Sequence, residues 1–189
     1  MGRVGGRSQG VRGGGQHGLI MNVTIREMAP GDWPAVATIY QEGIETGHAT
    51  FEAEVPAWEG WDEAHLPACR LVAESGNQVV GWAALSPVSD RCVYGGVAEV
   101  SVYVGAAGWG RGVGTELLTA LIEESEGTGF WSLQAQMFPE NAASVALHKK
   151  CGFREVGKRE RVGRMNYGSM KGVWRNVLLL ERRSDTVGV

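Results

Sequence analysis

Ser101-Val102-Tyr103-Val104 is followed by Gly110-Arg111-Gly112-Val113-Gly114-Thr115, and this run leads directly into Glu116-Leu117-Leu118-Thr119-Ala120-Leu121-Ile122. The first segment is rich in β-branched residues and predicts a strand. The apolar residues of the last segment fall on one face of a helix, so this segment predicts a helix. The chain therefore passes from a strand through a glycine-rich turn into a helix.

The glycine-rich turn predicts a binding site for an anion. Its alternating glycines let the backbone approach a ligand closely, and the start of the helix adds free amides and a positive dipole end. A pyrophosphate suits such a turn. The run lacks the Gly-Lys-Ser/Thr of a P-loop, and Thr115 stands where a dinucleotide-binding fingerprint has its third glycine. A glycine-rich helix entry that binds nothing is the alternative.

A second motif lies at residues 139–153, Pro-Glu-Asn-Ala-Ala-Ser-Val-Ala-Leu-His-Lys-Lys-Cys-Gly-Phe. It predicts a loop, a helix capped by Asn141 and a left-handed exit at Gly152. The two motifs together resemble the acetyl-CoA site of the GNAT acetyltransferase superfamily. In that superfamily Asn-x-x-Ala/Ser-x-x-Leu-Tyr/His-x-x-x-Gly-Phe follows the glycine turn by one helix and one strand.

Further segments resemble the phosphinothricin and methionine sulfoximine/sulfone acetyltransferases within that superfamily. They are Thr-Gly-His-Ala-Thr-Phe-Glu at 46–52, Ser-Pro at 86–87 with Arg91, Tyr94 and the strand 99–104, Arg-Met-Asn at 164–166, and Trp-Arg-Asn-Val at 174–177. The resemblance covers about residues 22 to 183. It implies an α/β GNAT fold: a mixed, mostly antiparallel sheet of about seven strands, splayed between the fourth and fifth, with about four helices on its faces.

The resemblance also implies a set of residues that bind acetyl-CoA as the co-substrate. The pyrophosphate would lie on Gly110, Arg111, Gly112, Val113, Gly114 and Thr115. Backbone groups of Val102, Tyr103 and Val104 would hold the pantetheine arm and polarise the thioester, and Asn141 would bond the arm. Trp109 stands where the superfamily has Gln or Arg, so a polar contact to the diphosphate is lost. Alternatively, Trp109 packs near the adenine or on a neighbouring subunit.

Acetyl transfer to an amine requires removal of a proton from the amine, stabilisation of an oxyanion and protonation of the leaving thiolate. Glu99, just before the thioester-binding strand, is the candidate base; the alternative is a strand-edge glutamate in an ion pair. His148 occupies the place where many relatives carry a tyrosine acid. It is the candidate acid, and its alternative role is packing or capping near a helix end.

The candidate acceptor site combines a loop cation with an apolar wall. Arg91 is suited to bind an α-carboxylate or phosphinate in a two-pronged manner, and its alternative role is a solvated loop charge. Ser89 and Gly95 stand where the phosphinothricin pattern has further arginines, which leaves room for an arsenic analogue or another amino-acid analogue. The remaining candidates for substrate binding are Phe51, Glu52, Tyr94 and Ser101, together with Ser89.

Composition sets the limits of the prediction. The 189 residues suit one domain. Residues 1–20 are rich in Gly and Arg and are expected to be disordered, residues 21–183 form the predicted acetyltransferase domain, and 184–189 a C-terminal tail. Without Arg3, Arg7 and Arg12, 15 of the 18 basic residues remain against 21 acidic ones. A net-negative domain argues against a nucleic-acid substrate.

Three widely spaced cysteines and the lack of histidine pairs predict no metal site. No run is apolar and long enough to predict a membrane span, and a cytoplasmic homodimer is expected. Taken together, these features predict an acetyl-CoA-dependent N-acetyltransferase acting on a small amino acid or amino-acid analogue. The alternatives are an amine or peptide acetyltransferase of the same fold, and a non-catalytic acyl-CoA-binding module.

Overall fold

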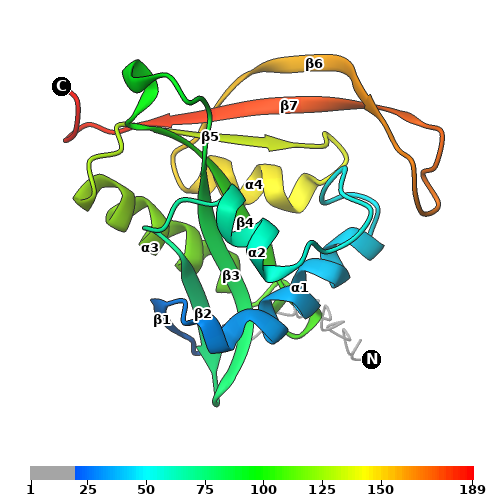
Figure 1. The fold of residues 1–189 in the computed structure, drawn as a ribbon, viewed down its shortest axis with the longest axis horizontal. Helices are drawn as coiled ribbons and strands as arrows, with labels where there is room; N and C mark the ends of the chain where they lie inside the picture. The colour runs from blue at the N-terminus through cyan, green and yellow to red at the C-terminus, as the bar shows by residue number, and fades with distance from the viewer. Residues whose placement is uncertain (1–19) are drawn as a thin grey trace, which may run out of the picture.

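The computed structural model describes residues 20–189, so the predicted tail of residues 1–20 lies outside it except for Ile20. The described chain forms one seven-stranded sheet with helices packed on both faces (Figure 1). In chain order the strands and α-helices are β1 (Thr24–Glu27), α1 (Trp33–Glu45), α2 (Trp58–Ala64), β2 (Leu71–Ser75), β3 (Gln78–Pro87), β4 (Val97–Val104), α3 (Val113–Gly127), β5 (Ser132–Met137), α4 (Ala142–Lys150), β6 (Arg154–Arg164) and β7 (Trp174–Arg183).

The strands lie in the order β1-β2-β3-β4-β5-β7-β6. Every neighbouring pair is antiparallel except β4 and β5, which run parallel. This arrangement confirms the predicted mixed, mostly antiparallel sheet of seven strands. β2 and β3 form a hairpin in which Gly76 and Asn77 both have a positive φ, of 55° and 66°, as the tightest hairpin turns require.

Alternation along β3 explains why helices cover both faces of the sheet. Successive side chains of a strand point to opposite faces. Trp82 and Ala84 pack with α1 and α2, in a cluster that contains Trp61. Ala83 and Leu85 pack with α3 on the other face. β3 is apolar at almost every position because both of its faces are buried.

The first helices begin without a side-chain cap. α2 begins at Trp58, two residues after Pro56. Asp32 directly precedes α1, but its carboxylate does not cap that helix. It accepts hydrogen bonds from Arg26 and from the backbone N–H of Ala29, so it joins the start of α1 to β1.

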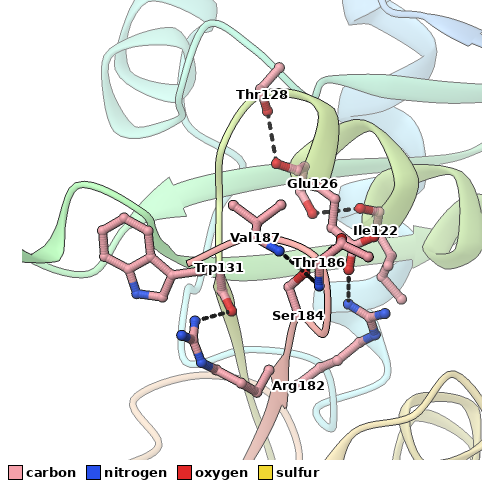
Figure 2. Close-up of polar contacts among 10 residues, drawn as sticks. Ile122, Glu126, Thr128, Trp131, Arg182, Ser184, Thr186 and Val187 are labelled. Atoms are coloured by element: carbon pink, nitrogen blue, oxygen red, sulfur yellow. Dashed lines mark hydrogen bonds and ion pairs between the residues drawn. The ribbon is translucent and has the colours of Figure 1, made fainter. Parts of the chain in front are cut away.

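The residues after β7, for which we predict a tail, fold back onto the start of β5 (Figure 2). The N–H of Ser184 donates to the carbonyl of Trp131 at 2.9 Å. The hydroxyl of Ser184 accepts from the N–H groups of Thr186 and Val187 at 3.1 and 3.0 Å. Within residues 20–189, no helix combines the length and the apolar character that crossing a membrane requires.

Candidate active site

The centre of the site is a gap in the sheet between β4 and β5. The two strands pair only over three rows, Val97–Ser132, Ala98–Leu133 and Glu99–Gln134. Beyond Glu99, β4 continues to Val104 without a partner on this side among the described residues. The predicted splay between the fourth and fifth strands is therefore confirmed, and it leaves a strand edge open to a ligand.

A cleft of about 1380 Å³ runs along this gap. It joins the glycine-rich turn, the open edge of β4, the loop after α1 and the start of α4. Of the residues proposed from the sequence, the cleft is lined by Glu99, Ser101, Val102, Tyr103, Val104, Gly110, Gly112, Val113, Gly114, Thr115, Asn141, His148, Phe51 and Glu52. The fold thus brings most of the predicted site together from segments far apart in the sequence.

The glycine-rich turn has the backbone that an anion site needs. Gly110 and Gly112 have φ values of 68° and 88°, a left-handed conformation that favours glycine. The N–H groups of Val113 and Gly114 have no hydrogen-bond acceptor among the described residues. They are first-turn amides of α3, where the helix dipole adds positive potential. The side chain of Arg111 does not line the cleft; it donates to the carbonyl of Ala107 at 3.3 Å.

The register of β4 determines which of its backbone groups face the gap. The N–H of Gly105 donates to the carbonyl of Val80, and Tyr103 lies opposite Trp82 in the same ladder. In an antiparallel ladder alternate residues turn their N–H and C=O groups to the same neighbour. The backbone of Tyr103 therefore faces β3, while those of Val102 and Val104 face the gap. The Tyr103 side chain is buried and stacks on Trp82 with ring centroids 4.7 Å apart.

Trp109 occupies part of the edge that β4 leaves open. Its indole Nε1 donates to the carbonyl of Val104 at 2.6 Å, so this carbonyl already has a partner. The ring lies at the cleft and remains 56% exposed. Val102 is thus the residue of β4 whose N–H and C=O are both directed at the gap without a recorded partner among the described residues.

Glu99 lies in the last paired row of β4 and lines the cleft. The amide of Gln136 donates to its Oε2 at 2.7 Å, and the guanidinium of Arg159 donates to the amide oxygen of Gln136 at 3.0 Å. Its Oε1 has no partner among the described residues. Gln136 thus orients the carboxylate and leaves one oxygen for a proton. Gln136 was not among the site residues predicted from the sequence. Its polar side chain on the strand that follows the splay could have indicated a place in the site.

His148 is 4% exposed and lines the cleft from α4. Its Nδ1 lies 2.8 Å from the carbonyl of Ser144, and because a carbonyl only accepts, Nδ1 carries a proton. Burial lowers the pKa of His148, although the hydrogen bond to Ser144 opposes this shift. The imidazole is therefore neutral near pH 7, and its Nε2 is a buried acceptor without a partner among the described residues.

Asn141 caps α4, as predicted, by accepting the N–H of Ser144 at 3.2 Å. Its amide Nδ2 donates to the carbonyl of His48 at 3.3 Å, which ties α4 to the loop after α1. That loop, residues 46–52, carries Phe51 and Glu52. Phe51 packs edge-on against Phe138 with ring centroids 4.8 Å apart, and Glu52 is exposed at the cleft.

Ser89, Arg91 and Tyr94 do not line this cleft. They border a second depression of about 630 Å³ with Val88, Val97, Trp131, Ser132, Gln134, Glu181 and Arg183. Both depressions lie on one face of the sheet, because Gln134 and Gln136 are two residues apart on β5 and therefore point to the same side. Gln134 lies opposite Glu99. The second depression therefore begins at the strand next to Glu99, and neighbouring strands lie about 4.8 Å apart.

Arg175, at the start of β7, was not among the predicted site residues. Its side chain is 1% exposed and makes hydrogen bonds to the loop 46–52 and to Glu140. The described residues contain no group of three or more His, Cys, Asp or Glu side chains able to hold a metal ion.

Residues 33–153 match the family model described as "Acetyltransferase (GNAT) family". The chain is 34% identical to the phosphinothricin N-acetyltransferase of Alcaligenes faecalis over 84% of this chain and 81% of the relative. It is 28% identical to the L-methionine sulfoximine/L-methionine sulfone acetyltransferase of Pseudomonas paraeruginosa over 76% of this chain and 87% of the relative.

The fold matches a solved structure that contains the co-substrate. A GNAT superfamily phosphinothricin acetyltransferase from Sinorhizobium meliloti, in complex with acetyl-CoA, superposes with a TM-score of 0.79. It is 25% identical in sequence, and the match covers 89% of this chain and 91% of that one.

Proposed function

The chain belongs to the GNAT family of acetyltransferases, and from this premise we propose that it transfers the acetyl group of acetyl-CoA to the amino group of a small amino acid or amino-acid analogue. The observation that carries the proposal is the position of Glu99. It lies where the open edge of β4 begins, and Arg91 borders the depression that starts at Gln134, the residue opposite Glu99 on the neighbouring strand.

The glycine-rich turn and the β4 edge suit acetyl-CoA. The free amides at the start of α3 would hold the pyrophosphate, together with the backbone of residues 110–115. The pantetheine arm would lie along β4, with Val102 as its main backbone partner because Tyr103 faces β3 and the Val104 carbonyl is occupied by Trp109. Acetyl-CoA supplies an activated acyl group, and the protein supplies position and proton transfer.

Glu99 would act as the base. An ammonium group near Oε1 transfers a proton to the carboxylate, and the neutral amine then attacks the thioester carbon. The carbon–sulfur bond then breaks, the attacking nitrogen loses its second proton and the CoA thiolate takes up that proton, which leaves an amide and free CoA thiol. The neutral state of His148 leaves Nε2 without a proton to give, so we assign this residue a hydrogen-bond accepting role in the cleft wall instead of the acid role.

The acceptor would span the two depressions. Its amine would lie at Glu99, and its carboxylate would reach toward Arg91, whose guanidinium lies 5.8 Å from the ring centroid of Tyr94. Ser89 and Ser101 would add hydroxyl groups at either end, and Phe51 and Glu52 would border the side chain of the acceptor. A free α-amino acid has its amine and carboxylate on one carbon, so a longer acidic side chain suits this span better.

A turnover assay tests the proposal. Purified protein is mixed with acetyl-CoA and a panel that contains phosphinothricin, methionine sulfone, methionine sulfoximine, common amino acids, a polyamine and a peptide with a free N-terminus; free thiol is then measured. We expect turnover with amino-acid analogues that carry an acidic or strongly polar side chain. Turnover of the peptide or polyamine alone would assign another acceptor class, and acetyl-CoA binding without turnover would indicate a binding module.

A further inference from the structure

Arg175 is a buried cation that lies behind residues that line the cleft. Its guanidinium donates to the carbonyl of Gly47 at 2.8 Å, to Nδ1 of His48 at 3.1 Å and to the carboxylate of Glu140 at 3.1 Å. The group lies 3.9 Å above the ring of Phe138. One side chain of β7 therefore joins the loop after α1 to the segment that precedes α4.

The charge of this guanidinium is balanced by Glu140. Partial desolvation opposes ionisation of that carboxyl, but hydrogen bonds from its own backbone and from Arg175 outweigh it and lower the pKa of Glu140. The ion pair is half open to water, because the Glu140 side chain is 55% exposed while Arg175 is 1% exposed. Because Glu140 lies at the surface, the hydrogen bonds of Arg175 to Gly47 and His48 are the ones that hold the buried guanidinium in one geometry.

The same loop has two further attachments. The Asn141 amide donates to the carbonyl of His48 at 3.3 Å, and the Tyr167 hydroxyl donates to the carbonyl of Thr50 at 2.9 Å. Its side chains His48, Phe51 and Glu52 all line the cleft. Hydrogen bonds from β7, from Asn141 at the start of α4 and from the β6–β7 loop thus hold the loop in position. The cleft-lining side chains of the loop would face the acceptor.

The contact with Arg175 determines which ring nitrogen of a neutral His48 carries the proton. A guanidinium has only donors, so Nδ1 of His48 must accept. The neutral ring then carries its proton on Nε2, and His48 contributes a hydrogen-bond donor to the cleft wall. Without Arg175, either ring nitrogen of His48 could carry the proton.

We propose that Arg175 is a positioning residue for the acceptor: it holds the loop 46–52 in place and fixes His48 as the Nε2–H tautomer. The proposal rests on the proposed function, since it names what sets acceptor binding in that site. Arg175 itself does not line the cleft, so it acts through the loop. Among the described residues Arg175 makes no hydrogen bond to the glycine-rich turn, β4 or Asn141, the groups proposed to hold acetyl-CoA, so acetyl-CoA binding should change little without it.

The first test is spectroscopic and does not need an acceptor. In the full chain labelled with ¹⁵N-histidine, the ring nitrogens of His48 should show the neutral Nε2–H tautomer at pH 7.5, assigned by its loss in His48→Asn. Arg175→Lys should convert this signal to a mixture of tautomers, because one ammonium does not reproduce the planar fork. A His48 that carries its proton on Nδ1 in the wild type would overturn the proposal.

The second test separates acceptor binding from acetyl-CoA binding. We expect Arg175→Lys to raise the acceptor KM about tenfold, the loss of roughly one charged hydrogen bond, and to leave the acetyl-CoA Kd within about twofold. His48→Ala should have the same effect, whereas His48→Asn should recover most of the affinity because its Oδ1 can accept from Arg175 in place of Nδ1. Arg182→Lys, on the same strand but away from the cleft, is the matched control.

These outcomes distinguish the inference from the proposed function. An acceptor KM that stays within about twofold in Arg175→Lys, or an acetyl-CoA Kd that rises equally, would overturn the positioning role. Should Arg175→Lys fail to fold, the His48→Ala and His48→Asn pair decides the same point, because His48 is only partly buried. A wild type that acetylates no small acceptor would refute the proposed function, while the tautomer of His48 would still decide the Arg175 contact.

Discussion

Strand β4 determines the position of the Glu99 side chain, and the hydrogen bond from Gln136 determines the orientation of its carboxylate. Gln136 comes from β5, so the two side chains meet only because β4 and β5 run parallel up to this row. A donor on one oxygen leaves the other oxygen without a partner among the described residues, which suits the proposed role of Glu99 as base. In that proposal the orientation of the carboxylate depends on a single hydrogen bond across the point where the sheet opens.

Replacing Glu99 by Gln should lower kcat by about 10²-fold, the usual size of a general-base contribution, and leave the acetyl-CoA Kd unchanged. The amide keeps the shape of the side chain and removes the proton acceptor. Steady-state kinetics and calorimetry measure the two quantities. Glu160→Gln, on exposed β6, serves as the control. Turnover within about twofold of wild type from pH 6 to 9 would remove Glu99 from the mechanism.

Replacing Arg91 by Ala should raise the acceptor KM by roughly ten- to a hundredfold, since a charged hydrogen bond contributes about 1.5–3 kcal/mol. The KM for acetyl-CoA should stay the same, because Arg91 borders the second depression and not the main cleft. Arg91→Lys should recover part of the loss. Lys158→Ala on β6 is the control, and an unchanged acceptor KM in Arg91→Ala would place the carboxylate elsewhere.

At the scale of elements, the turn before α3 joins local conformation to binding. Gly112 stands at the N-cap of α3 in a left-handed conformation, and among the described residues only Ile20 approaches the place of its missing Cβ, at 3.6 Å. The backbone conformation, and not a lack of space, therefore favours glycine at this position. Gly114 differs, since a Cβ would lie 3.1 Å from the Leu147 side chain, which would have to shift by a few tenths of an ångström.

Gly112→Ala should cost about 1–2 kcal/mol of stability, because a residue with a Cβ disfavours the left-handed region. It should also weaken acetyl-CoA binding, since relief of the strain turns the amides of the turn away from the anion. Urea denaturation and calorimetry measure both effects. Gly127→Ala near the end of α3 is the matched control: Gly127 has no positive φ, and an added Cβ would meet none of the described residues within 4 Å. The stability of this variant should stay the same or rise. Equal effects at both positions would contradict this explanation.

At the scale of the whole molecule, buried or paired titratable groups couple folding to pH. The pKa of Asp32 is lowered chiefly by hydrogen bonds from Arg26, and that of Glu126 chiefly by Arg182. Burial lowers the pKa values of His65 and His148. All four groups bind protons more weakly in the folded chain than in the unfolded chain. Their contribution to stability is therefore present at high pH and is lost as the pH falls.

The free energy of unfolding should therefore fall in two stages on acidification. The first begins near pH 6.5, where unfolded histidines take up protons, and the second near pH 4, where unfolded carboxylates do. His148→Gln should reduce the first stage, and Asp32→Asn the second. Urea denaturation between pH 3 and 8 measures both. A stability that is flat from pH 7 to 5 would contradict the neutral, buried state of the two histidines.

The hairpin of β6 and β7 is expected to hold the dimer contact. β6 is an edge strand of the sheet. Val162 of β6, and Val173 and Trp174 at the start of β7, are 39%, 43% and 56% exposed. Exposed apolar groups on an edge favour association. Light scattering should give a dimer for the wild type and a monomer for Trp174→Glu with intact secondary structure. A wild type that is monomeric at micromolar concentration would refute the expected homodimer.

Local patterns in the sequence predicted the strand, turn and helix at 101–122 and the capped helix after Asn141. Caps, glycine exits and hydrophobic periodicity act over a few residues, so Asn141, Gly152 and the turn at 110–115 could be read locally. The resemblance to a family then supplied the arrangement of the strands, the splay and the proposed site for acetyl-CoA.

Which side chains meet depends on the tertiary structure. Arg175 contacts Gly47 across 128 residues of sequence, and Gln136 reaches Glu99 across 37. Such contacts depend on sheet register and on how loops cross the sheet, and no pattern in a single segment contains that information. The same holds for Arg91, which borders its own depression. It also holds for His148, whose neutral state follows from burial and whose tautomer follows from a carbonyl on its own helix.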